Sequence, residues 1–399
     1  MKYSQRVNRL LDSPTLAIAA KAKKMIASGQ DVVSFSAGEP DFNTPDFVKH
    51  AGIEAIENNY TGYTSALGIP ELRKIVAGWM SNESMTEYKQ ENILISHGAK
   101  YAIALALLAT MDSDDEVIIP APYWVSYPQM VSLSSAKPVI MDCPISSGYK
   151  ITPDLLEKTI TPSTRMIFIN NPSNPTGTVY TKQELVDIAN VLEKYPDIWI
   201  LSDEIYSRIV YDDAEFISIA ALSENIKERT IIANGVSKAF SMTGWRLGWM
   251  AANKELIKQA GKIQSHTISC PSSISQRAAV KALTGDDSYL ENWVETYKKR
   301  RDLLLGLVGE IEGIEPFCPS GAFYLFCDIS QWIGKTSQNG FKIDSCLDAA
   351  EFLLNEALVA LVPGGAFGAP GHIRFSFACS EDNIVKGCAR IKQAIEGLR

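Results

Sequence analysis

A single lysine at the end of an apolar segment is the first feature of this sequence that could do chemistry. In "TIIANGVSKAFSMTGWRLGW", residues 230–249, a run of apolar residues ends in small residues, then Lys238, and Arg246 follows. Burial disfavours the charged form of a lysine and lowers its pKa. Such an amine is a nucleophile toward carbonyl groups and forms Schiff bases. Arginine stays charged and suits a two-point grip on phosphate.

Two further apolar runs are followed by residues that could bind the same kind of ligand. "NILIS" (92–96) precedes Gly98 and Ala99, where a helix would begin with free backbone N–H groups. Such a helix start is an anion site that suits phosphate. "EVIIP" (116–120) precedes Trp124, whose flat face suits a planar ring.

Polar side chains follow the next two runs. "RMIFIN" (165–170) leads to the turn "NPSNPTG" with Asn174, and "IWILS" (198–202) leads directly to Asp203 and then to Tyr206. A carboxylate at the end of a buried strand is costly unless it meets a cation or a hydrogen-bond donor. Tyr206 lies about one helical turn further on and can point the same way.

Each of these residues has an ordinary explanation when taken alone: a plain strand–helix turn, core packing of an aromatic side chain, a tight turn or a simple salt bridge. Together they describe one ligand. The lysine suits an aldehyde, the helix start and the arginine suit a phosphate, and the tryptophan suits a flat ring. The aspartate suits a protonated ring nitrogen, and the asparagine and tyrosine suit an oxygen. Pyridoxal 5'-phosphate has all of these groups.

The elements that must position these residues are predicted to form a sheet that is buried on both faces. The runs above and "RLGWMAA" (246–252) are continuous rather than alternating, as strands buried on both faces require. They alternate with helical segments such as "TKQELVDIANVLEKY", which predicts βαβ units and a mostly parallel sheet. In such α/β sheets ligands bind beyond the carboxyl ends of the strands, which is where the polar residues above occur.

The C-terminal part has a different pattern. The amphipathic stretch "LENWVETYKKRRDLLLGLV" leads to "GAFYLFCDI", a helical segment "CLDAAEFLLNEA", and the strand-like "LVALVP" and "HIRFSF". We expect a smaller α+β domain here. The predicted organisation is an N-terminal segment (1–45) that joins the small domain, a large cofactor-binding domain (46–290) and a small C-terminal domain (291–399).

Composition excludes several classes of protein. The 399 residues carry a net charge of -8, which argues against a general nucleic-acid binder. Seven scattered cysteines without a C-x-x-C pair indicate reduced thiols in the cytoplasm, and with four histidines no metal site is expected. The longest apolar stretch, "YAIALALLATM", is about half the ~20 residues that a membrane span needs, so we expect a buried helix. The N-terminus does not resemble a signal peptide.

Several motifs, in this order, resemble the class I aminotransferases of the pyridoxal-phosphate fold type I superfamily, and among them the bacterial aspartate aminotransferase-like branch. The motifs are "SAGEPDFNTP", "YTSALGIPELR", "HGAKYA", "PYWVSYP", "NNPSNPTG", "SDEIY", "SKAFSMTGWRLGW", "SGAFY" and "HIRFSFA". The resemblance covers nearly the whole chain. It implies an α/β fold with a mostly parallel seven-stranded sheet in a large domain, plus a smaller α+β domain built from both termini.

The resemblance also implies roles for the residues. Lys238 would be the catalytic Schiff-base lysine, Asp203 the partner of the ring nitrogen and Tyr206 a ligand of the phenolic oxygen. Tyr63 would reach the phosphate of the neighbouring subunit, which implies a homodimer with shared active sites. The implied cofactor-binding residues are Lys238, Gly98, Ala99, Lys100, Trp124, Asn174, Asp203, Tyr206, Ser237, Arg246 and Tyr63; the implied substrate-binding residues are Gly38, Trp124, Asn174 and Arg374.

The sequence departs from the family pattern in three places. Gly235 stands where many members have a phosphate-binding hydroxyl three residues before the lysine, and Ser237 or Lys100 would compensate. Leu108 stands where we place a lysine that holds the second carboxylate of the substrate in some members. Leu11 replaces a lysine typical of members that accept prephenate, which leaves two polar candidates in that segment, Ser13 and Thr15.

The predicted reaction is transfer of an α-amino group in amino acid metabolism, with aspartate as donor and 2-oxoglutarate as acceptor. Aromatic, alanine-type and prephenate substrates remain alternatives, as does β-elimination on the same cofactor. A regulator with a DNA-binding module ahead of this fold is disfavoured because "GEPDF" begins at residue 38. We expect a cytoplasmic enzyme without nucleic-acid or membrane partners.

Overall fold

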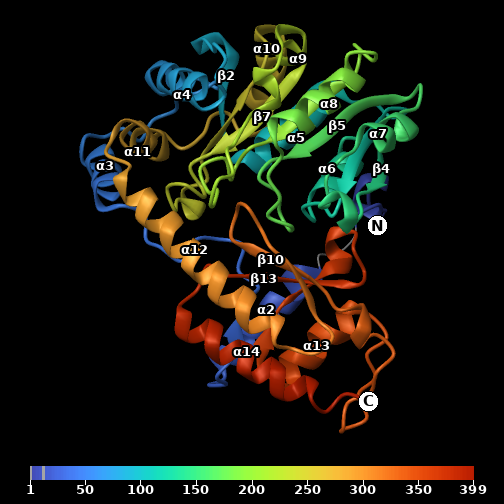
Figure 1. Ribbon diagram of the computed structural model, residues 1–399. Helices are drawn as coiled ribbons and strands as arrows, with labels where there is room; N and C mark the ends of the chain where they lie inside the picture. Colours follow the sequence, from blue (N-terminus) through green and yellow to red (C-terminus); the bar gives the residue numbers. More distant parts are fainter. Residues whose placement is uncertain (1, 11–13) are drawn as a thin grey trace.

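A seven-stranded sheet forms the larger body of the protein, in a computed structural model that describes residues 2–10 and 14–399 (Figure 1). Strand β8 runs antiparallel to both of its neighbours, and the remaining pairs are parallel. The mostly parallel sheet predicted above is therefore confirmed. Its strands, in spatial order, are β2 (Ile93–Ser96), β8 (Gly248–Ala251), β7 (Thr230–Gly235), β6 (Trp199–Asp203), β5 (Thr164–Asn170), β3 (Glu116–Ala121) and β4 (Lys137–Asp142).

The six apolar runs correspond to six of these strands, and β4 has no such run. This strand lies at the edge of the sheet, and most of its side chains are partly or fully exposed. An edge strand needs no continuous apolar sequence, and Pro138 is tolerated there because one edge lacks a partner strand. The apolar-run pattern therefore could not find it.

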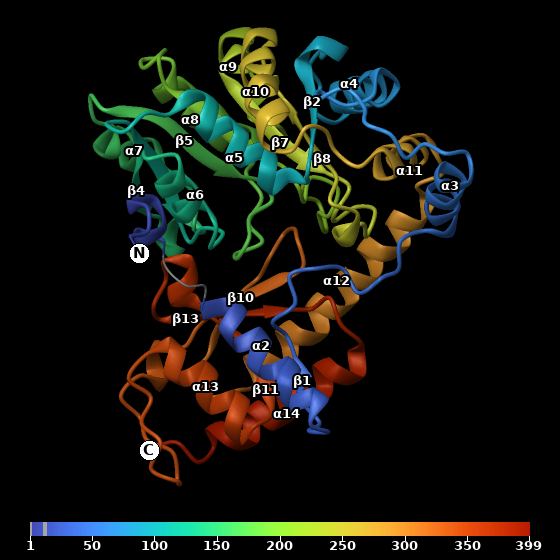
Figure 2. The same ribbon diagram turned by 180° about the vertical axis from the view of Figure 1, so that it is seen from behind.

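Helices cover both faces of the sheet (Figures 1 and 2). The side chains of Met166 and Phe168 pack toward one face, and those of Ile167 and Ile169 pack toward the other. The first face is covered by α5 (Ala99–Thr110), α6 (Tyr127–Leu133) and α10 (Lys254–Thr267). The second is covered by α3 (Asp46–Glu57), α4 (Pro70–Glu83) and α11 (Ser273–Thr284) at its β2 end, and by α7 (Pro153–Thr159), α8 (Lys182–Leu192) and α9 (Glu224–Glu228) toward β4. Helix α5 is the buried helix predicted from "YAIALALLATM".

The smaller body is built from both ends of the chain. Its antiparallel sheet has the order β12 (Val362–Pro363), β13 (His372–Ser376), β10 (Tyr324–Asp328) and β9 (Glu315–Phe317). Strand β1 (Val33–Ser34) pairs with β11 (Val359–Ala360), so this part of the N-terminal segment lies beside the C-terminal part. The helices of this body are α2 (Pro14–Ala27), α13 (Cys346–Glu356) and α14 (Glu381–Ile395) (Figure 2).

Helix α12 (Ser288–Gly309) runs from the large sheet to the small one (Figure 1). It is continuous across residue 290, so the domain boundaries given above stay a prediction.

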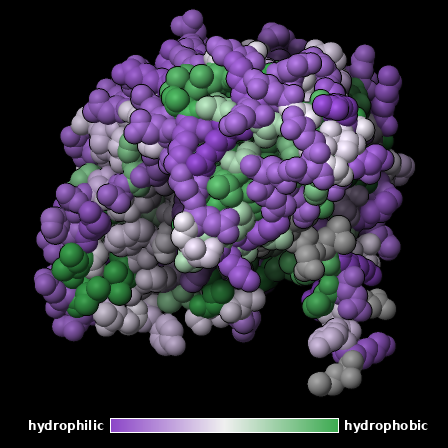
Figure 3. Space-filling view, turned by 90° about the horizontal axis from the view of Figure 1, so that it is seen from below, coloured by the Kyte–Doolittle hydropathy of each residue, from purple (hydrophilic) through white to green (hydrophobic). Residues whose placement is uncertain are grey.

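The hydropathy of the surface and the state of the cysteines can be compared with what the composition indicated. On the face shown in Figure 3, hydrophilic residues predominate among the coloured atoms, and hydrophobic residues gather in separate small patches. In the described part of the chain no helix has the length and apolarity that crossing a membrane requires. All seven cysteines are free thiols.

Candidate active site

The predicted site residues gather at the carboxyl ends of the central strands. Asp203 ends β6, and its register partner on β7 is Ala233, five residues before Lys238. Asn170 ends β5 opposite Asp203, and Asn174 follows in the next turn. Arg374 reaches the same place from β13 of the small sheet, because its side chain bonds to that of Asn174. The two bodies of the protein therefore meet at the site.

Asp203 is a buried carboxylate, 4% exposed, with its own set of donors. The Tyr127 hydroxyl donates to Oδ2 at 2.7 Å, and the Ile205 N–H approaches Oδ1 at 3.3 Å. Burial raises the pKa of Asp203 to about 6, although the Tyr127 bond, the Ile205 N–H and the charge of Lys238 act in the other direction. The carboxylate is therefore ionised at neutral pH and suits a protonated nitrogen.

Lys238 is half-buried, and its amine donates to the carbonyl oxygen of Gly38. Burial lowers the pKa of Lys238 to about 8, and the nearby carboxylate of Glu39 opposes this shift. The amine lies 5.7 Å from the ring centroids of both Tyr206 and Phe323. With a pKa of about 8, about a tenth of this amine is neutral at pH 7, far more than for an ordinary lysine, and the neutral form is the nucleophile.

Tyr206 and Asn174 each have a partner that fixes the side chain. The Tyr206 hydroxyl is buried and shares a 2.7 Å hydrogen bond with the hydroxyl of Tyr324. The backbone N–H of Asn174 donates to Oδ1 of Asn170 at 2.8 Å. Its side-chain oxygen accepts from Arg374 Nη1 at 2.9 Å. The polar groups predicted to meet an oxygen are thus held in place.

Arg374 is buried, 5% exposed, and has no acidic partner in the described chain. Its guanidinium carbon lies 4.2 Å from the ring centroid of Tyr324 and 5.0 Å from that of Phe367, in the turn Gly364–Phe367. Nη2 donates to the Ser36 carbonyl at 3.4 Å, and Nε is buried without a partner among the described residues. A buried, stacked guanidinium with a free donor is suited to a carboxylate.

The start of α5 and Arg246 form a cradle for an anion. Gly98 precedes the helix with φ 80°, and no side chain caps the N–H groups that begin at Ala99. A side-chain carbon at Gly98 would lie 2.9 Å from Arg246 Nη2, so the guanidinium comes close to the helix start. Arg246 Nη1 donates to the carbonyl of Thr243 at 2.9 Å, and Nη2 approaches the carbonyl of His97 at 3.5 Å. These groups fit a phosphate.

The glycine that departs from the family pattern has a structural reason. Gly235 pairs with Gly248 across β7 and β8. A side-chain carbon at Gly235 would lie 2.7 Å from Gly248 Cα, so a hydroxyl residue does not fit this register. Ser237, two residues further along the chain, is buried and remains the candidate for a phosphate-binding hydroxyl.

Trp124 and Lys100 lie together beside this cradle. Trp124 is half-buried and meets the Tyr127 ring edge-on at 5.4 Å between centroids. Lys100 follows Ala99 in α5, and its amine lies 4.7 Å from the Trp124 ring centroid. Burial lowers the pKa of Lys100, with a further contribution from the charge of Arg246. The Trp124 ring and the Lys100 amine therefore lie next to each other at the site.

Other predicted residues are not brought to the site. Leu108 is 45% exposed and lies nine residues after Ala99, about 13 Å further along α5, so the position we assigned to a substrate-binding lysine is away from the site. Tyr63 is 93% exposed and stays a prediction for a neighbouring subunit. Leu11, Ser13 and the side chain of Thr15 lie outside the described residues.

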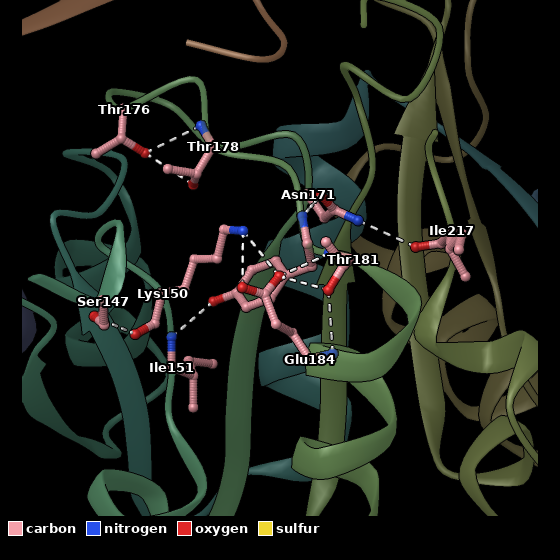
Figure 4. A network of polar contacts seen from close by, with 10 residues as sticks. Ser147, Lys150, Ile151, Asn171, Thr176, Thr178, Thr181, Glu184 and Ile217 are labelled. Atoms are coloured by element: carbon pink, nitrogen blue, oxygen red, sulfur yellow. Dashed lines mark hydrogen bonds and ion pairs between the residues drawn. The ribbon is translucent and has the colours of Figure 1, made fainter. Parts of the chain in front are cut away.

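A polar network supports the turn that carries Asn174 (Figure 4). Asn171 accepts the N–H of Tyr180 at 3.1 Å and donates to the carbonyl of Ile217 at 3.1 Å. The Tyr180 hydroxyl accepts the N–H of Ile151, beside the 2.8 Å ion pair between Lys150 and Glu184.

Sequence reasoning did not assign roles to Tyr127, Tyr324 and Asn170. All three occur inside motifs that we had quoted, "PYWVSYP", "SGAFY" and "NNPSNPTG". Their contacts cross between elements, and only the folded structure shows them.

Known proteins resemble this chain over nearly its whole length. The family described as aminotransferase class I and II matches residues 30–391. The chain is 43% identical to the probable aspartate/prephenate aminotransferase of Rickettsia felis over 98% of this chain and 96% of that protein. It is 40% identical to the aspartate aminotransferase of Rhizobium meliloti over 99% and 96% of the two chains.

Solved structures agree as well. The crystal structure of the Rhizobium meliloti aspartate aminotransferase superposes with a TM-score of 0.96, covering 100% of both chains. Aspartate aminotransferase from Thermus thermophilus with maleate superposes with a TM-score of 0.92 at 37% identity, covering 99% of this chain and 100% of that one. Members of the family generally depend on pyridoxal 5'-phosphate. The chain thus belongs to the aminotransferase class I and II family and is an aminotransferase.

Proposed function

We propose that this enzyme holds pyridoxal 5'-phosphate on Lys238 and moves the α-amino group of L-aspartate to 2-oxoglutarate. The observation that carries the proposal is the half-buried Lys238 amine, with its pKa lowered to about 8, close enough to the buried carboxylate of Asp203 for their charges to interact. When bound, the cofactor supplies an aldehyde for the amine and a protonated ring that draws electrons from the substrate Cα.

The residues of the chain divide the remaining work. Lys238, once released as a free amine, takes the Cα proton as general base and later returns it as general acid. Asp203 keeps a proton at the ring nitrogen because its carboxylate is ionised at neutral pH. Tyr206 and Asn174 would hold the phenolic oxygen, and Trp124 would contact the ring.

The α-carboxylate of the substrate and the phosphate of the cofactor are bound by separate sets of residues. Arg374 holds the α-carboxylate with its free donors, aided by the backbone of Gly38, and so decides which bond at Cα is aligned for cleavage. Gly98, Ala99 and Arg246 hold the phosphate, with Ser237 as the additional hydroxyl.

Aspartate is favoured over a monocarboxylate because the site offers a second cation. Lys100 lies beside the Trp124 ring and forms no ion pair within the described chain. We assign to Lys100 the second carboxylate of the substrate, the role first considered for position 108, in place of the phosphate-binding role that the resemblance implied. Relatives named aspartate aminotransferase and a neighbour solved with maleate, a dicarboxylate, support this choice.

A panel of half-reactions tests the substrate. The enzyme saturated with cofactor is mixed with aspartate, alanine, phenylalanine or cysteine conjugates, and the loss of the yellow form is followed. We expect aspartate to give the highest kcat/KM. A preference for alanine or phenylalanine would remove aspartate as the substrate. Continued ammonia release with one amino acid alone would indicate β-elimination instead of transfer.

Prephenate is a second candidate acceptor, because relatives at 43% identity are named aspartate/prephenate aminotransferase. Enzyme converted to its amino form by aspartate is then mixed with prephenate or 2-oxoglutarate. Return of the yellow form with prephenate would establish this activity, and return with 2-oxoglutarate alone would exclude it.

We also propose a homodimer in which Tyr63 completes the phosphate site of the partner. The exposed Tyr63 side chain, together with exposed Ile53 and Ile56 on α3, supports a self-association surface. Hybrid dimers of Tyr63→Ala and Lys238→Ala chains test it. One site of each hybrid would carry both changes and the other neither, so activity should reappear on mixing. If each chain supplied its own Tyr63, mixing would restore nothing. The cytoplasmic location stays a prediction.

A further inference from the structure

The contact between Tyr127 and Asp203 joins two buried groups that lie on different elements. Tyr127 begins α6, and its side chain is 2% exposed; Asp203 ends β6. The hydroxyl donates to Oδ2 at 2.7 Å, which leaves Oδ1 with the longer 3.3 Å contact from the Ile205 N–H. The Tyr127 ring is fixed by Phe168 at 4.6 Å and by Trp124 at 5.4 Å between centroids.

We propose that Tyr127 is a positioning residue that keeps Asp203 charged and turned toward the cofactor ring by donating a hydrogen bond to one carboxylate oxygen. This inference rests on the proposed function, because Asp203 matters only if a ring nitrogen lies opposite it. The geometry divides the carboxylate into one oxygen held by the protein and one oxygen left for the ligand. Tyr127 itself touches neither substrate nor reacting atoms and acts through Asp203.

Other titratable groups also face Asp203 and must be separated from Tyr127. They are Lys238 from the loop after β7, and Glu204 and Tyr206 from the segment that continues β6. Glu204 turns to the opposite side of the strand, where the hydroxyls of Ser202 and Ser218 donate to its Oε1 at 2.8 and 2.6 Å. Burial raises the pKa of Glu204 to about 7. It therefore titrates in the same range as Asp203 and needs a control.

The sign of the effect follows from linkage. Asp203 has a folded pKa of about 6, above its ordinary value of 3.8, so its contribution to stability is complete below pH 3.8 and is lost as the pH rises through 6. Removal of a hydrogen bond to the charged form raises the folded pKa further, by about one to two units. Tyr127→Phe should therefore cost more stability at pH 8 than at pH 5.

The test is a pH series of unfolding free energies for the full-length, cofactor-free chain. We expect the cost of Tyr127→Phe to grow between pH 5 and pH 8 by the equivalent of a 10- to 100-fold change in the unfolding equilibrium, at about tenfold per pKa unit. In an Asp203→Asn background the cost of Tyr127→Phe should no longer increase with pH. Glu204 titrates in the same way in both chains that are compared, so its contribution to the difference cancels. Tyr180→Phe is the matched control, because its buried hydroxyl accepts an N–H and bonds no carboxylate; its cost should not vary with pH.

A cost of Tyr127→Phe that is the same at every pH, or that persists in the Asp203→Asn background, would overturn the proposal. If Tyr127→Phe does not fold, 3-fluorotyrosine at position 127 replaces it; its more acidic hydroxyl is a stronger donor and should shift the pH dependence the opposite way. An unchanged profile there would equally refute the role. These outcomes are read without cofactor, so failure of the proposed function would show separately, as a wild-type chain that carries out no half-reaction.

Discussion

Replacement of Arg374 by lysine tests how the substrate carboxylate is held. The guanidinium carbon of Arg374 lies 4.2 Å from the ring centroid of Tyr324 and 5.0 Å from that of Phe367, and its Nε is free. Lysine keeps the charge but cannot form two parallel bonds. Loss of one hydrogen bond to a charged group costs about 1.5–3 kcal/mol, or about 10- to 150-fold in kcat/KM. The loss should appear mainly as weaker substrate binding, with the cofactor retained.

The assay is the half-reaction with aspartate over a range of concentrations, with cofactor content measured by absorbance. Arg229→Lys is the matched control. Arg229 is also buried, but its guanidinium donates to the main-chain carbonyls of Leu192 and Tyr195, away from the proposed site. This control should lose stability and keep its kcat/KM. Refutation would be a folded, cofactor-loaded Arg374→Lys enzyme whose kcat/KM lies within twofold of wild type.

Three further outcomes are expected. The rate at which cofactor attaches to the cofactor-free chain should rise about tenfold per pH unit below pH 8 and level off above it, because the Lys238 amine, with its pKa of about 8, must be neutral to attack. Stopped-flow absorbance measures this rate. A rate that still rises past pH 10 would contradict the prediction. Lys100→Met should weaken the half-reaction with aspartate more than that with alanine, and an equal loss for both would assign Lys100 to the phosphate. Glu184→Ala should lower kcat by a few-fold by loosening the turn of Asn174, while Lys194→Ala, which removes only an exposed ion pair, should not.

Much of the site could be predicted from the sequence because its residues follow strands. Asp203, Asn174 and Lys238 each come after an apolar run, and the ends of parallel strands meet at one edge of the sheet. The same local rule located the anion cradle at Gly98, because a helix start always exposes N–H groups.

Contacts between distant segments could not be predicted in this way. The pairing of Tyr127 with Asp203 spans 76 residues, and that of Tyr206 with Tyr324 spans 118. Neither follows from periodicity. Strand β4 was not found because an exposed edge carries no apolar run, and the distance of Leu108 from the start of α5 follows only from the folded helix.

The central claim is that the cofactor is bound covalently to one lysine. Its most direct test is reduction of the cofactor-saturated enzyme with borohydride, followed by proteolysis and mass spectrometry of the peptides. We predict that the mass of the reduced cofactor is found on the peptide that contains Lys238. A label on a different lysine, or no label on any peptide, would contradict the account.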